Sequence, residues 1–184
     1  MITSAEWFNP TRVSGLVAYG TAVTCCVVAW VTTKAGQRSR RAAMLTLIEG
    51  FLLLDIAFSW RLHLHDFFEH IAQRHNEYAA RRLPQVIVLC ILLGMLLLSL
   101  FAIWRLFRGA VGARLTISGI LLSLALWWTE VISLHQVDHA FYYRLGNIFS
   151  PLGDLMPVGI FWIVAAFMTS AGILIESRQS KSAL

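Results

Sequence analysis

Residues Leu83–Trp104 read LPQVIVLCILLGMLLLSLFAIW, a run of 22 residues that contains no charged side chain. A helix needs about 20 apolar residues to cross the hydrocarbon core of a bilayer. Apolar residues follow one another here instead of alternating with polar ones, which predicts a helix and not a barrel strand. Because the run is apolar on all sides, we expect this helix to face lipid or a partner subunit.

Four further runs have the same character. They cover Val13–Thr33, Ala42–Trp60, Leu115–Leu134 and Leu155–Ile175. Across the chain 58% of the residues are hydrophobic and 14% are charged, whereas soluble domains carry about 25% charged residues. No polar stretch is long enough to form a second domain. The sequence therefore predicts an all-α fold in which residues 1–184 form a single transmembrane domain, an integral membrane bundle of five transmembrane helices.

Basic residues are divided unevenly between the two sides of such a bundle. Nine Lys and Arg residues fall in the segments 34–41 and 105–114 and in the C-terminal tail, against six on the other side. Cytoplasmic loops carry the excess of Lys and Arg. We therefore expect a bacterial inner (plasma) membrane protein with its N-terminus outside and its C-terminus in the cytoplasm. The formal net charge of +5 follows from the same rule, and no binding of nucleic acid is expected.

The segment Arg61–Arg82 differs from a loop in its composition. It contains neither Pro nor Gly, and apolar residues recur at helical spacing between its charges. We expect the second helix either to continue past the membrane or to bend into an amphipathic helix that lies on the membrane surface.

All the histidines of the chain fall in the two inter-span segments of one face, the predicted outer face. The six are His63, His65, His70, His75, His135 and His139. Glu49 and Asp55 lie inside the second span, and Glu130 lies near the end of the fourth. Ionisable groups at membrane depth are costly, and they face the interior of a bundle or a water-filled cavity. We therefore expect these acids to point inward.

A straight second helix gathers polar side chains on one face. At about 100° per residue, Asp55, Ser59, Asp66 and His70 fall within an arc of about 60°. Histidines and an acid also share a face of the fourth helix, and bundle metal sites are built from such groups on facing helices. The sequence predicts a site for a transition metal (zinc, iron or copper), with these candidate ligands: His65, Asp66, Glu130, His135, Asp138 and His139.

Two other interpretations fit the same residues. In the first, buried acids pass protons to surface histidines, or the site faces a quinone; its candidate catalytic residues are Asp55, Arg61, Glu130 and Tyr142. In the second, Arg61 pairs with Asp55 or Asp66, and Glu130 pairs with a histidine, which ties the helix ends together. The protein is then a non-enzymatic structural or accessory subunit of a larger membrane complex, bound through Leu83–Trp104. No phosphate-binding loop, nucleophile elbow or dinucleotide fingerprint is present.

Overall fold

The chain folds into α-helices. The computed structural model describes residues 9–33, 37–61, 63, 64, 66, 67, 70, 82–106, 111–132 and 155–181. Within these ranges there are five helices and no strand, which confirms the predicted all-α fold. The helices are α2 (Pro10–Thr32), α3 (Gln37–Phe58), α5 (Arg82–Leu106), α6 (Val111–Ile132) and α8 (Pro157–Lys181).

Four of the helices are long and apolar enough to cross a bilayer: α2, α5, α6 and α8. The protein is therefore an integral membrane protein whose apolar helices contact lipid. The remaining helix, α3, falls short on composition and not on length, because its 22 residues include Arg40, Arg41, Glu49 and Asp55.

The helix ends differ from the ends of the apolar runs. The last helix continues to Lys181, past the predicted end at Ile175, and α3 begins at Gln37 instead of Ala42. A helix satisfies its own backbone hydrogen bonds in water as well as in lipid, so an apolar run marks only the part inside the membrane. At the start of α2 the signal is local: Pro10 occupies the first turn, and the Asn9 side chain accepts from Thr11 N–H at 2.9 Å, a normal N-cap.

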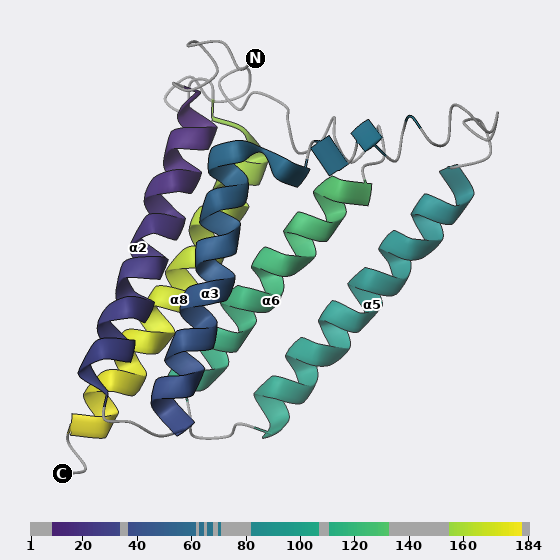
Figure 1. The fold of residues 1–184 in the computed structure, drawn as a ribbon. Coiled ribbons are helices and arrows are strands. Elements are labelled where there is room, and N and C mark those ends of the chain that lie inside the picture. Colours follow the sequence, from purple (N-terminus) through teal and green to yellow (C-terminus); the bar gives the residue numbers. More distant parts are fainter. Residues whose placement is uncertain are drawn as a thin grey trace.

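The helices α2, α3, α6 and α8 stand side by side, and α5 lies at the edge of the bundle beside α6 (Figure 1). The most extensive pairings are α6 with α8 and α2 with α3 and α8. Consecutive helices run in opposite directions. As a result α3 and α6 end, and α2, α5 and α8 begin, at one end of the bundle, which we call the Ser59 end; the opposite end is the Thr33 end.

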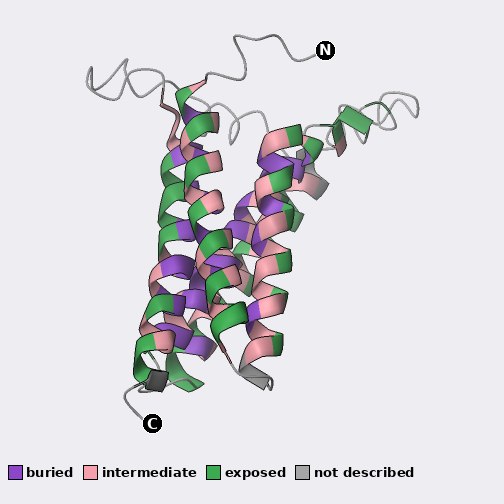
Figure 2. Ribbon diagram, turned by 60° about the vertical axis from the view of Figure 1, so that its left-hand side comes forward, coloured by how far each residue is buried: buried purple, intermediate pink, exposed green. Residues whose placement is uncertain are grey.

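The interior is built from one side of each central helix, and Figure 2 shows the buried positions facing inward and the exposed ones outward. Tyr19 and Ala22 of α2 meet Leu52 and Ile56 of α3 there, together with residues of α6 and α8: Leu126, Val158, Trp162 and Ala166. Close approach of α6 to α8 depends on glycine, because a Cβ on Gly119 would lie 2.6 Å from the carbonyl oxygen of Ala165. Small residues of this kind let membrane helices pack closely.

The surface of α5 is apolar. An 18-residue stretch of this helix, within Gln85–Leu106, has no buried residue. Large side chains along the helix are exposed, among them Ile91, Leu93, Met95, Leu97, Leu98 and Phe101. The helix touches α6 near both ends, through Gln85 Nε2 donating to the Ile132 carbonyl at 3.0 Å and through Arg114 over the Trp104 ring at 4.9 Å. The prediction that this helix faces lipid or a partner agrees with its exposure.

Candidate functional site: a buried arginine between two acids

The chain changes direction where α3 ends. Ser59, the residue after Phe58, has a φ of 57°, in the left-handed region that residues other than Gly, Asn and Asp rarely adopt. Its N–H donates to the carbonyl of Asp55 at 2.6 Å. Figure 1 shows the helical residues that follow running across the end of the bundle instead of extending α3. An amphipathic surface helix over this segment stays a prediction, because most of its residues lie outside the described ranges.

The turn at Ser59 brings Arg61 back onto Asp55. The Arg61 backbone N–H donates to Asp55 Oδ1 at 2.8 Å, and its guanidinium donates to Oδ2. On a straight helix these two residues would lie about 9 Å apart along the axis and about 120° apart around it. The predicted arc of polar residues along one straight face is therefore wrong beyond Ser59. The structure instead shows the pairing of Arg61 with Asp55.

A second acid meets the same guanidinium from α6. Glu130 Oε2 lies 2.5 Å from Arg61 Nε. The side chain of Arg61 is 8% exposed, and the side chains of Asp55 and Glu130 are each 1% exposed. The three charged groups thus join the end of α3 to the end of α6 inside the bundle, where water screens them little.

Trp162 of α8 completes this group, which we call the Arg61 cluster: Asp55, Arg61, Glu130 and Trp162. The Trp162 indole N–H donates to Glu130 Oε1 at 3.2 Å, and the Arg61 guanidinium lies 4.7 Å from the centre of the ring. That stacking is a cation–π contact, which strengthens when water is excluded. Gly15 of α2 makes room for the ring, because a Cβ there would lie 2.6 Å from Trp162 Cε3.

The cluster brings two acids to one base. Two carboxylates, Asp55 and Glu130, face the guanidinium of Arg61 from different helices. Arginine suits the position because its planar fork donates in several directions at once, and because it stays charged at every physiological pH.

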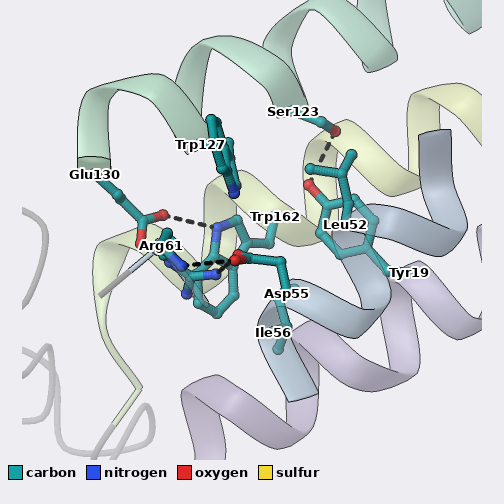
Figure 3. Close-up of a pocket in the computed structure, with 9 residues that line it drawn as sticks. All are labelled: Tyr19, Leu52, Asp55, Ile56, Arg61, Ser123, Trp127, Glu130 and Trp162. Carbon is teal, nitrogen blue, oxygen red and sulfur yellow. Dashed lines mark hydrogen bonds and ion pairs between the residues drawn. The ribbon is translucent and has the colours of Figure 1, made fainter. Parts of the chain in front are cut away.

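A small cavity adjoins the cluster (Figure 3). The volume open to the centre of a water-sized sphere is about 10 Å³. One buried water molecule needs about this volume. Both polar and apolar residues line the cavity: Tyr19, Leu52, Asp55, Ile56, Arg61, Ser123, Trp127, Glu130 and Trp162. The Tyr19 hydroxyl donates to Ser123 Oγ at 2.9 Å on one side. On the other, the buried Trp127 indole N–H has no hydrogen-bond acceptor among the described residues, and it turns toward the cluster.

The predicted site residues divide into three groups. Asp55, Arg61 and Glu130 come together in the Arg61 cluster. Asp66 is exposed, beyond the turn at Ser59. The other candidates lie outside the described residues: His65, His135, Asp138, His139 and Tyr142.

In the described part of the chain, no three His, Cys, Asp or Glu side chains converge as a metal site. The Glu130 oxygens are engaged by Arg61 and Trp162.

Sequence reasoning missed the uncharged members of the site. Trp162 carried a weak signal, since it lies inside the last apolar run and not at its end, where aromatic belts form. Tyr19 and Ser123 carried none that separates them from the many hydroxyls of membrane helices, which bond to their own backbone as Thr21 and Thr24 do. Only the packing of α2 against α6 and α8 brings them to the cavity.

Comparison with protein-family models, with curated proteins and with solved structures finds no match to this chain. The site is therefore interpreted from its own geometry and charge.

Proposed function

We propose that this protein is a five-span plasma-membrane protein in which the Arg61 cluster is a proton-transfer site near the outer face. The observation that carries the proposal is that two buried acids from different helices, Asp55 and Glu130, meet at one guanidinium. The side chains of the three residues are 8% exposed or less. Ionisable groups buried at membrane depth in this way form the proton relays of membrane proteins.

We propose α3 as the fifth membrane-spanning helix. Its 22 residues make a helix about 33 Å long, which matches a hydrocarbon core of about 30 Å. It packs along α2, and both of its acids point into the bundle and not toward lipid, since Glu49 and Asp55 are 0% and 1% exposed. Buried acids lower the mean hydropathy of a helix without exposing charge to the bilayer.

The outer placement follows from the distribution of basic residues. The Thr33 end carries the loops richest in Lys and Arg, which favours the cytoplasm for that end. The Ser59 end, with the cluster, then faces outward together with the segments that hold the six histidines. Histidine changes protonation near neutral pH, so these side chains suit the exchange of protons between the cluster and water.

A metal site at the same end of the bundle is the alternative to the proton-transfer site. Histidines and acids of the two outer segments would supply the ligands, with Glu130 below them. The Glu130 oxygens already contact Arg61 and Trp162, so a metal would compete with both contacts. The geometry of Glu130 therefore favours the proton over zinc, iron or copper.

Proton flux into proteoliposomes tests the proposal. Vesicles with a pH-sensitive dye inside and a potassium potential set by valinomycin should acidify faster with the protein than without it. Glu130→Gln and Asp55→Asn should bring the rate down to that of protein-free vesicles. Glu176→Gln is the matched control, because Glu176 pairs with Arg41 at 3.3 Å at the opposite end of the bundle and should leave the rate unchanged.

Two results decide against the proton site. Wild-type vesicles that acidify no faster than empty ones would exclude proton transfer, as would a Glu130→Gln protein with wild-type flux. Elemental analysis of the same preparation tests the metal site. A stoichiometric metal that is lost in His135→Ala would establish that site.

A second function rests on α5. Its apolar surface lies at the edge of the bundle, and an 18-residue stretch of the helix has no buried residue. That observation favours an accessory subunit that binds a larger membrane complex through this helix. Extraction in mild detergent followed by native electrophoresis distinguishes the two: a stable monomer that retains proton flux excludes the subunit function.

A further inference from the structure

Glu49 is an acid that the Arg61 cluster does not use. It lies on α3, six residues before Asp55, which places it about 9 Å deeper along the helix axis. It is 0% exposed. Glu49 is thus buried near the middle of α3, away from both ends of the bundle.

Glu49 has no basic partner among the residues that the structure describes. Neither carboxyl oxygen makes a hydrogen bond of normal geometry within the described part of the chain. The titratable groups that face it come from α2, the Cys26 thiol and the Tyr19 hydroxyl. From α8 it faces the Thr169 hydroxyl.

The Thr169 hydroxyl of α8 is the polar side chain beside Glu49. It donates to the carbonyl of Ala165 at 3.3 Å, and α6 confines it closely, since a Cβ on Gly119 would lie 2.5 Å from Thr169 Oγ1. Burial of a carboxyl group among neutral groups disfavours its charged form.

A carboxylate without a cation or a donor is strongly disfavoured in an apolar interior, and such a group is neutralised by binding a proton. We propose that Glu49 is a second proton-binding site of the molecule, a carboxylic acid at the centre of the bundle that exchanges its proton with the Arg61 cluster through Tyr19 and Ser123. The exchange, but not the site itself, rests on the proposed function.

Tyr19 is placed to carry the exchange. Its hydroxyl donates to Ser123 Oγ at 2.9 Å, and it lies within electrostatic range of Glu49, Glu130 and Arg61. Tyr19 and Ser123 both line the cavity beside the cluster. Hydroxyl groups accept one proton while they donate another, so a Tyr–Ser pair with one water can pass a proton without becoming charged for long.

Infrared spectroscopy of the full-length protein in lipid tests the site. At neutral pH the wild type should show the C=O stretch of a protonated carboxyl group. Glu49→Gln should remove that band, and Glu176→Gln should keep it. A Glu49→Gln protein that keeps the band and loses a carboxylate band instead would overturn the proposal.

A second measurement needs no variant. Dicyclohexylcarbodiimide reacts with carboxylic acids in apolar surroundings, and mass spectrometry of the labelled wild type should locate the adduct on Glu49. Labelling confined to other acids would count against the site.

Proton exchange between Glu49 and the Arg61 cluster can be measured separately from the Glu49 site itself. In D₂O the band of Glu49 shifts as the proton is replaced by deuterium, and Tyr19→Phe should slow that shift several-fold. An unchanged rate would reject the route through Tyr19. If proteoliposomes show no proton flux while the band is present and is lost in Glu49→Gln, the proposed function fails and the Glu49 site stands.

Discussion

Arg61 lies between two carboxylates where little water can screen the three charges. Breaking a buried ion pair by removing one partner costs about 3–5 kcal/mol, because the remaining charge is left uncompensated. Arg61→Met keeps the aliphatic bulk and removes the charge, and it leaves Asp55 and Glu130 facing each other. We expect the free energy of unfolding in mixed micelles, measured by denaturant titration, to fall by about 3–5 kcal/mol.

The control for that substitution removes the orphaned charges as well. Adding Asp55→Asn and Glu130→Gln to Arg61→Met should recover most of the lost stability, since neutral amides replace the two carboxylates. A single Arg61→Met protein that is as stable as the wild type would show that water reaches these charges after all.

At this scale the sequence identified the charged residues of the site and one of their pairings, Arg61 with Asp55, but not the contact of Arg61 with Glu130. Asp55 and Glu130 stand out because acids are rare in apolar runs, and the expectation that buried acids point inward agrees with the 1% exposure of both side chains. Trp162 and the glycine that makes room for it did not stand out. Their roles depend on which helices are neighbours, and no pattern within a single helix contains that information.

Ser59 is the element-scale feature that forms the site, because the turn there ends α3 and returns Arg61 to Asp55. A side chain in the left-handed region costs roughly 1–2 kcal/mol that glycine avoids, while glycine loses more backbone entropy on folding. We expect Ser59→Gly to raise the free energy of unfolding by about 0.5–1 kcal/mol. Ser59→Ala is the control: it keeps the Cβ, so it should give no such gain. Thermal unfolding of both variants in the same detergent checks the difference, and equal midpoints would contradict it.

The sequence described the helices themselves better than their junctions. Apolar runs predicted the spans to within a few residues at most ends, because the length of a helix in a bilayer is set by the thickness of the hydrocarbon core. A bend after the second span was one of the two predicted outcomes, but its position at Ser59 was not predictable, since serine is not typical of positive φ. The close packing of Gly112 in α6, where a Cβ would lie 2.7 Å from the carbonyl oxygen of Gly172, also depends on the neighbouring helix.

For the whole molecule, the arrangement of charges connects the fold to the proposed function. Apolar surface faces outward on α5, and the buried Arg61 cluster lies inside the four-helix core at one end, while the half-exposed Arg41–Glu176 pair lies at the other. Between them lie Glu49 and the Tyr19–Ser123 pair. Because α3 carries two of the three buried acids of this series, Glu49 and Asp55, the proposal requires α3 to cross the membrane.

Cysteine accessibility tests that topology directly. With Cys25, Cys26 and Cys90 replaced by alanine, single cysteines are placed at Thr33 and Phe67, which flank α3. A third is placed at Val111, the exposed first residue of α6. A membrane-impermeant maleimide should label Phe67→Cys in intact cells, and it should label Thr33→Cys and Val111→Cys only after the membrane is permeabilised. Labelling of Thr33→Cys and Phe67→Cys from the same side would mean that α3 does not cross. The reverse pattern, with Thr33→Cys and Val111→Cys labelled in intact cells, would place the Arg61 cluster at the cytoplasmic face and the basic loops outside.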